Sequence, residues 1–305
     1  SYKYQNEYGC GYINKNEVCS LFNGDLHSLN EFLITCLLKN KTDSSILEHA
    51  PLSSSCKIDI NDLEIIASLP NPNSFRDAYA FRQHVEAGRR NRGLEMIPEY
   101  DEFPVFYFSN HNSIIGPGIV NVYEKHLEKL DFELEIAIII GKSGVNIKAS
   151  EADSHIFGYT IMNDWSARKL QMEEMKLNLG PAKGKDFATS IGPYITTLDD
   201  LKKYQVKSGN YSTYDIPLSA SINGVKVSTD NLKNMTWSFQ EIIERASYGS
   251  PLFPGDLIGS GTCGTGCLLE LNGSSSKEQW LKDGDTVSID AGVLGNLTNK
   301  IQLIK

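Results

Sequence analysis

The sequence predicts an α+β fold that is mostly β, with few short helices at the margins of antiparallel sheets. Short apolar runs of strand length dominate residues 69–305, and turn motifs such as Pro254-Gly255-Asp256 and Asp283-Gly284-Asp285 lead into them. Strands and helices also show little regular alternation, which would have indicated a parallel Rossmann-type sheet. The 305 residues are enough for one large domain, or for one large and one small domain.

The N-terminal part is expected to form a small α/β domain over residues 1–68. Its clearest element is a helix over 26–38, where the apolar residues at 26, 29, 33 and 37 follow helical spacing. The proline-rich segment 69–73 is expected to end this domain, because a residue that precedes proline is pushed out of the helical conformation. The main domain is then expected over residues 69–305.

The main domain is expected to be rich in strands. The expected strands cover residues 105–108, 132–140, 157–162, 217–222, 257–259, 268–271 and 286–289. The expected helices cover residues 81–93, 150–155, 165–175 and 239–246.

Composition and charge indicate a small-molecule ligand. The net charge is -9, and the densest basic cluster is only Arg89-Arg90-Asn91-Arg92, so neither nucleic acid nor an anionic membrane is expected as a partner. Apolar runs fall short of the ~18 to 20 residues of a membrane helix, and the first residues do not resemble a signal peptide, so a cytoplasmic location is expected. The six cysteines lack Cys-x-x-Cys spacing, which favours buried thiols over a zinc site or a disulfide framework.

Two glutamates, Glu133 and Glu135, stand two residues apart in the otherwise apolar run of residues 130–140. Side chains in a strand alternate between faces, so both carboxylates are expected to converge on one spot beside the core. Like charges in a region of low dielectric need a partner, and a hard cation with oxygen ligands is the commonest one. The alternative is a strand with one wet face, on which both glutamates are solvated.

A second informative stretch covers residues 158–171, where an apolar strand ends and a helix is expected to begin near Asp164. At helical spacing, Asp164, Arg168 and Gln171 share one face. The alternative is that Asp164 caps the helix, Arg168 is its i+4 partner and Gln171 is exposed.

Three more residues are candidates for a site. Asp77 is a possible further oxygen ligand, and His84 is a candidate general base because its ordinary pKa lies near neutrality. A lone histidine in a helix is more often structural, so His84 needs neighbours to be interpreted. Glu270 lies among leucines and needs a partner if it is buried, and a histidine that it orients is one candidate.

Two loops remain open to interpretation. The glycine-rich loop 259–267 lacks Gly-Lys-Ser/Thr and is expected to precede a strand, so a phosphate-binding function is not indicated. Lys183 and Lys185 follow a Gly-Pro turn, where either lysine could be solvated or could face an anionic intermediate.

Taken together and in this order, these segments resemble the fumarylacetoacetate hydrolase family. The matching segments are Asp77-x-Tyr79 with Arg82-Gln83-His84, Leu130-Asp131-Phe132-Glu133-Leu134-Glu135, Ile156-Phe157-Gly158, Met162-Asn163-Asp164-Trp165-Ser166-Ala167-Arg168, Gly184-Lys185-x-Phe187, and Ser260-Gly261-Thr262 leading to Leu269-Glu270-Leu271. They span about residues 70 to 300. The resemblance implies the mixed β-sandwich roll of that family, in a compact microbial-type member that forms a homodimer.

The resemblance also implies a role for each matching position. Four carboxylates match the ligands of a divalent cation, Mg²⁺ or alternatively Ca²⁺ or Mn²⁺: Asp77, Glu133, Glu135 and Asp164. The positions that match catalytic groups are the base His84, its orienting acid Glu270, and the oxyanion- or enolate-stabilising Arg168, Gln171 and Lys185. The positions that match substrate-binding groups are Tyr79, Arg92, Tyr107 and Thr262. Thr189 matches a further polar position at the ion or ligand.

The activity implied by the resemblance is hydrolysis of a C–C bond in a β-diketone acid, which is a fumarylacetoacetate-like or acylpyruvate (2,4-dioxo acid) substrate. In that reaction His84 activates the water that attacks the metal-chelated substrate. One alternative is an oxaloacetate decarboxylase, or an isomerase or dehydratase of 2-oxo acids, on the same metal site. The presence of both His84 and Glu270 favours hydrolysis, because decarboxylation needs no activated water. A non-catalytic ligand-binding β domain is the second alternative.

Overall fold

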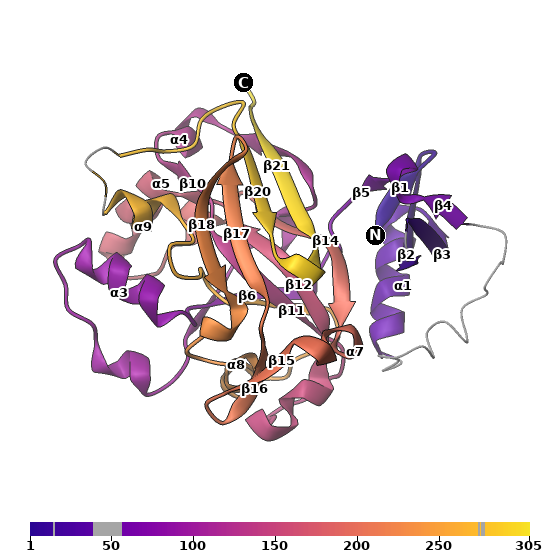
Figure 1. The fold of residues 1–305 in the computed structure, drawn as a ribbon, viewed down its shortest axis with the longest axis horizontal. Coiled ribbons are helices and arrows are strands. Elements are labelled where there is room, and N and C mark those ends of the chain that lie inside the picture. The colour runs from indigo at the N-terminus through magenta and orange to yellow at the C-terminus, as the bar shows by residue number, and fades with distance from the viewer. Residues whose placement is uncertain (15, 39–56, 274, 276–277) are drawn as a thin grey trace.

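Antiparallel strands dominate the fold of the chain (Figure 1). The computed structural model describes residues 1–14, 16–38, 57–273, 275 and 278–305. In these parts the strands form three large sheets and two small two-stranded ones, while most helices are short. The predicted fold class, α+β and mostly β, is confirmed. None of the described helices is both long and apolar enough to cross a membrane.

The first sheet belongs to the N-terminal residues, and its strands lie in the order β4-β3-β2-β1-β5. Its elements are β1 (Tyr2–Tyr4), β2 (Glu7–Asn14), β3 (Glu17–Gly24), α1 (Leu26–Leu38), β4 (Lys57–Asp59) and β5 (Glu64–Ile65). Helix α1, which the apolar spacing predicted, lies against β2 and β3. In Figure 1 these elements lie to one side of the larger body.

The second sheet carries the candidate site, and its seven strands lie in the order β7-β6-β19-β11-β12-β14-β8. Its strands are β6 (Ser74–Ala78), β7 (Phe106–Phe108), β8 (Ile114–Ile115), β11 (Leu134–Ile140), β12 (Ile156–Asp164), β14 (Thr189–Thr197) and β19 (Asp256–Gly259). The central strand β11 is buried along its whole length, because both faces of the sheet are covered.

The third sheet packs on one face of the second and encloses the main hydrophobic core. Its order is β18-β17-β20-β21-β9. Its strands are β9 (Gly118–Val122), β17 (Pro217–Ile222), β18 (Val225–Asn231), β20 (Thr286–Asp290) and β21 (Asn296–Leu303). Ile136 and Ile138 of β11 meet Ile289 and Leu297 in this core. On the opposite face, Ala137 and Ile139 pack in a second cluster with Phe75 and Met162.

The remaining elements surround these sheets. They include α3 (Arg82–Arg90), α4 (Glu124–Leu127), α5 (Arg168–Glu174), α6 (Ala182–Lys185), α7 (Leu198–Leu201), α8 (Phe239–Ser247), α9 (Leu268–Asn272), a 3-10 helix (Ala149–His155), and the strand pairs β10 (Leu130–Asp131) with β13 (Ser166–Ala167) and β15 (Gln205–Ser208) with β16 (Tyr211–Tyr214). Of the cysteines, Cys10, Cys263 and Cys267 are buried as predicted, and Cys19 is only partly buried. The side chains of Cys36 and Cys56 lie outside the described residues.

One predicted element is wrong, and another begins later than predicted. The expected strand 268–271 is the helix α9, so the glycine-rich loop precedes a helix. A four-residue apolar run does not distinguish strand from helix, and the Asp131 carboxylate accepts the first two N–H groups of α9. The expected helix 165–175 begins only at Arg168, because Ser166 and Ala167 pair with β10 and the fully buried Trp165 donates to Ser190.

The domain boundary remains a proposal. We propose that it lies in segment 69–73, since the chain passes there from the first sheet to β6 of the second. The two parts touch nearby, because the Ser68 and Thr160 hydroxyls lie 3.2 Å apart. Within the N-terminal part, the Ser1 hydroxyl donates to the Ser68 carbonyl.

Candidate active site

The candidate site lies on the face of the second sheet that carries the smaller hydrophobic cluster. Residues i and i+2 of a strand share a face, so Asp77 follows Phe75 on β6, Asp164 follows Met162 on β12, and Glu135 precedes Ala137 on β11. Each of these carboxylates therefore lies next to an apolar residue on the same face of its strand. Gly259 at the end of β19 leaves room for them, because a Cβ there would clash with Oδ1 of Asp77.

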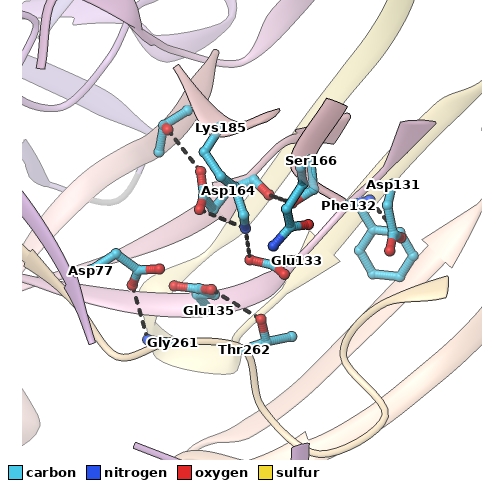
Figure 2. A network of polar contacts seen from close by, with 12 residues as sticks. Asp77, Asp131, Phe132, Glu133, Glu135, Asp164, Ser166, Lys185, Gly261 and Thr262 are labelled. Carbon is cyan, nitrogen blue, oxygen red and sulfur yellow. Dashed lines mark hydrogen bonds and ion pairs between the residues drawn. The ribbon is translucent and has the colours of Figure 1, made fainter. Parts of the chain in front are cut away.

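The four carboxylates expected from the sequence gather at this spot (Figure 2). Oxygens of Asp77, Glu133 and Glu135 lie within 4.8 Å of one another, and all three side chains are buried. Glu133 lies just before β11, and its N–H donates to the Asn163 side chain over 2.9 Å. Asp164 lies beside this triad, joined to Glu133 through the ammonium of Lys185.

Glu133 has strong cationic partners. Lys185 donates to its Oε2, and the Arg168 guanidinium donates to its Oε1 over 2.8 Å. Burial alone would raise the pKa of Glu133, but these two cations outweigh it and hold the pKa well below its ordinary value. Glu133 is therefore ionised.

In the part of the chain that the structure describes, no cationic side chain pairs with Asp77 or Glu135. The Gly261 N–H donates to Asp77 over 3.1 Å, and Thr262 donates to Oε1 of Glu135 over 3.2 Å. Burial, followed by repulsion from Asp164, raises the pKa of Asp77 to about 8. Burial and the charges of Asp77 and Glu133 raise the pKa of Glu135 well above its ordinary value. This side of the cluster is short of positive charge.

Asp164 is held by three donors. They are the Tyr107 hydroxyl at 2.6 Å, the Lys185 ammonium at 2.9 Å and the Thr189 hydroxyl at 3.1 Å. Burial nevertheless raises the pKa of Asp164. Tyr107 and Thr262, both expected to bind substrate, thus make hydrogen bonds to carboxylates of the cluster. Lys183, the other lysine considered from the sequence, is exposed and pairs with Asp186.

Arg168 organises the next layer. It donates through Nε to Asp131 over 2.8 Å, through one terminal nitrogen to Glu133, and through the other to the Gln171 side-chain oxygen over 3.0 Å. The expectation that Asp164, Arg168 and Gln171 share one helix face is wrong, because Asp164 ends β12 and lies four residues before α5 begins at Arg168. Only Arg168 and Gln171 share that face.

Asp131 is a residue of this site to which the sequence assigned no role. It is fully buried and accepts hydrogen bonds from Arg168 and from the N–H groups of Leu268 and Leu269. It thereby ties the arginine to the first turn of α9, the helix that carries Glu270. Its signal in the sequence was an aspartate in an otherwise apolar stretch, two residues before Glu133.

A histidine–glutamate pair lies beside the carboxylates. His84 is in the first turn of α3 and Glu270 is on α9, and Nδ1 of His84 lies 3.1 Å from Oε2 of Glu270. Both side chains are nearly buried. Because a carboxylate accepts, Nδ1 carries the proton and Nε2 is left as the basic nitrogen. The pair has the geometry of an oriented general base.

A pocket adjoins this pair. The His84 ring meets the Tyr79 ring edge to face at 5.6 Å. Tyr79 and Arg92 line a cavity of about 270 Å³, whose other walls are mostly apolar, including Tyr100 and Phe103. Two of the four residues expected to bind substrate therefore lie in a pocket next to the candidate base.

The carboxylate cluster fits a hard divalent cation. Its donors are all oxygen, as Mg²⁺, Ca²⁺ and Mn²⁺ prefer. Among the described residues, Lys185 pairs with Glu133 and Asp164, and Arg168 pairs with Glu133 and Asp131, so the four carboxylates, once ionised, outnumber the cations that pair with them. Within the described part of the chain, the buried Oε2 of Glu135 has no hydrogen-bond partner. Such an oxygen, beside carboxylates with raised pKa, matches a cation ligand.

Known proteins are similar to this chain in sequence and in fold. Residues 73–302 match the family described as fumarylacetoacetate (FAA) hydrolase C-terminal. A fumarylacetoacetase of Oryza sativa subsp. japonica is 30% identical over 298 residues, which cover 80% of this chain and 69% of that protein. The oxaloacetate tautomerase YisK of Bacillus subtilis is 32% identical over 216 residues, which cover 70% of this chain and 66% of that protein.

The chain thus spans about two thirds of the length of these relatives. Among solved structures, the fumarylacetoacetate hydrolase of Exiguobacterium antarcticum superimposes with a TM-score of 0.75 and 21% identity, covering 99% of this chain and 98% of that one. At this identity the superposition shows a common fold.

Proposed function

Because the chain belongs to the fumarylacetoacetate hydrolase family, we propose that it hydrolyses a C–C bond of a β-diketone acid, a fumarylacetoacetate-like or acylpyruvate substrate. The observation that carries the proposal is the His84–Glu270 pair beside the carboxylate cluster. A hydrolase needs a base to activate water, and the pair supplies one with a defined tautomer.

The proposed role of His84 is to take a proton from water at Nε2. Glu270 holds the ring through Nδ1 and stabilises the imidazolium that forms. The hydroxide then attacks the carbonyl next to the bond that breaks, and the proton on His84 can pass to the departing carbon.

Three donors, Arg168, Gln171 and Lys185, are proposed to stabilise the oxyanion and the departing enolate. Arg168 occupies the side-chain oxygen of Gln171, so the Gln171 amide directs its N–H groups elsewhere. Lys185 uses two of its three hydrogens on Glu133 and Asp164 and retains one. Removing one such donor typically raises the barrier by ~2.7 to 4 kcal/mol.

Mg²⁺, or alternatively Ca²⁺ or Mn²⁺, is the proposed cofactor, and Asp77, Glu133, Glu135 and Asp164 would hold it. When bound, such an ion polarises carbonyl oxygens as a Lewis acid. Thr189 supports the site by donating to Asp164. Tyr79 and Arg92 are proposed to bind the acid's far end in their pocket. Homodimer formation and a cytoplasmic location remain predictions.

The test is turnover of 2,4-dioxo acids and oxaloacetate with Mg²⁺ and with a chelator. We expect Mg²⁺-dependent release of pyruvate and a carboxylic acid from a 2,4-dioxo acid. His84→Ala should lower kcat by roughly 10²- to 10⁴-fold with Mg²⁺ binding intact. His155→Gln, at an equally buried histidine that contacts the Lys142 carbonyl, is the matched control. Undiminished turnover by His84→Ala would remove this residue from the mechanism.

The second candidate is a tautomerase, isomerase or decarboxylase of 2-oxo acids on the same site. The likeness to the oxaloacetate tautomerase of Bacillus subtilis favours it. Enol–keto conversion or CO₂ release from oxaloacetate, without hydrolysis of any 2,4-dioxo acid, would establish this candidate instead. Absence of activity together with absence of Mg²⁺, Mn²⁺ and Ca²⁺ binding would support a non-catalytic ligand-binding domain.

A further inference from the structure

A second cluster of possible metal ligands overlaps the site. Ligand atoms of His84, Glu133 and Cys267 lie within 4.8 Å of one another, and all three residues are buried. Cys267 immediately precedes α9 and has no part in the proposed hydrolysis. The hydrolytic chemistry therefore does not explain why a thiol faces the base and a carboxylate.

The ligand types of this cluster differ from those of the carboxylate cluster. Nitrogen, thiolate sulfur and one carboxylate oxygen suit Zn²⁺, whereas Mg²⁺ and Ca²⁺ prefer oxygen alone. Three protein ligands with a fourth position open are typical of zinc sites that retain a water or another small ligand. Glu133 thus belongs both to a site for a hard cation and to a site for a softer cation.

The surroundings of His84 also suit a metal ligand. Glu270 engages Nδ1, which leaves Nε2 for a cation. A carboxylate that accepts from the second ring nitrogen is the usual partner of a metal-bound histidine, because it fixes the tautomer and makes the ligating nitrogen more basic. The arrangement that orients a base therefore also orients a ligand.

We propose that His84, Cys267 and Glu133 form a site for Zn²⁺ or a similarly soft divalent cation, which inhibits the enzyme. On binding, the Cys267 thiol proton passes to water and the thiolate and Nε2 of His84 coordinate the ion. His84 can then no longer accept a proton from water. The inhibition rests on the proposed function of His84, whereas the binding of the cation does not.

Cys263 provides a matched control. It is fully buried like Cys267, lies four residues earlier in the same loop, and is not in the ligand cluster. Cys263→Ser and Cys267→Ser therefore make the same chemical change at neighbouring buried positions, and only the second removes a ligand. Cys267→Ala is a further variant in case serine at this position prevents folding.

The experiment adds Co²⁺ as a spectroscopic probe to the metal-free full chain and, separately, titrates Zn²⁺ into the Mg²⁺-supported assay. We expect a thiolate-to-cobalt charge-transfer band in the wild type and in Cys263→Ser, and none in either Cys267 variant. The concentration of Zn²⁺ that halves activity should rise by roughly 100-fold in the Cys267 variants, since loss of even an outer partner of a ligand costs about 10- to 100-fold.

Either of two results would overturn the site. One is a wild-type protein without the charge-transfer band, and the other is a band that survives in folded Cys267 variants. A band without any hydrolytic activity would keep the zinc site and reject the proposed hydrolysis, so failures of the two proposals can be told apart.

Discussion

Glu133 and Glu135 are two residues apart and reach the same cluster, yet their environments are opposite. Glu133 is paired with Lys185 and Arg168, and its pKa is lowered. Glu135 accepts from the Thr262 hydroxyl and has no cationic partner among the described residues, and its pKa is raised. The same type of side chain, buried in both cases, is thus balanced by positive charge on one side of the site, the balanced side. On the other side, the deficient side, positive charge is lacking.

The contrast separates two tasks within one cluster. The balanced side, with Lys185, Arg168 and Gln171, holds the donors that an anionic intermediate needs. The deficient side, with Asp77 and Glu135, has no cationic partner among the described residues, so both pKa values are raised and the carboxyls retain protons that a bound cation would displace. The predictions below test this division, beginning with the largest expected effect.

The isosteric pair Glu133→Gln and Glu135→Gln should differ in stability when a chelator is present. Glu133→Gln removes a partner from two buried cations and should lower the free energy of unfolding by about 3 to 5 kcal/mol. Glu135→Gln replaces a buried carboxyl whose pKa is raised well above its ordinary value by a neutral amide, and should leave the free energy unchanged or higher. Urea unfolding measures both.

Both variants should bind Mg²⁺ more weakly, which calorimetric titration checks. An equal loss of stability in the two variants would contradict the division of the cluster.

Asp131→Asn should cost about 1.5 to 3 kcal/mol of stability, the range for hydrogen bonds to a charged group. An amide cannot replace a carboxylate that accepts from Arg168 and from two N–H groups of α9. Because α9 carries Glu270, kcat should fall more than KM rises. Urea unfolding and steady-state kinetics test this, with Asp186→Asn, at an aspartate paired with exposed Lys183, as the control. Wild-type stability would argue against the role of Asp131.

The metal-free protein should lose stability as the pH rises from about 4 to about 8. The pKa of Asp77 is raised from an ordinary 3.8 to about 8. The folded state therefore retains a proton that the unfolded state has released, and stability falls by up to about 1.4 kcal/mol per pH unit for this group. The pKa of Glu133 is lowered, so the change in stability that its titration causes lies below its ordinary 4.5 and does not oppose this trend.

Mg²⁺ binding requires the ionised carboxylates, so it should raise the melting temperature more at pH 8 than at pH 6. Thermal unfolding with and without Mg²⁺ measures the difference, and Asp77→Asn should reduce it. A melting temperature that does not change with pH in the presence of chelator would contradict the raised pKa of Asp77.

Tyr107→Phe should have the smallest effect. The Tyr107 hydroxyl donates to Asp164, so its loss should weaken Mg²⁺ binding by about tenfold and leave KM for the organic acid nearly unchanged. The Mg²⁺ dependence of the rate at saturating substrate measures the first quantity. A rise in KM at saturating Mg²⁺ would return Tyr107 to the substrate-binding role expected from the sequence.

Much of the fold was readable from local patterns. Apolar spacing predicted α1, and the apolar run that becomes β11 was long enough to be assigned. The strands β14 and β21 were not predicted, because polar residues interrupt them and one pairing partner of each, β8 and β9 respectively, lies far away in the sequence. Segment 268–271 was assigned to the wrong class, since its helix depends on Asp131, more than 130 residues earlier.

By itself, the sequence determined which residues could carry charge into the core: acids at the ends of apolar strands, a histidine, and a lysine in a Gly-Pro loop. Alternation along a strand was enough to predict that Glu133 and Glu135 meet. Only the tertiary structure decided that they differ, because Lys185 and Arg168 come from other elements and, of the two glutamates, donate to Glu133. Electrostatic environment depends on distances across the fold, and local periodicity holds no information about them.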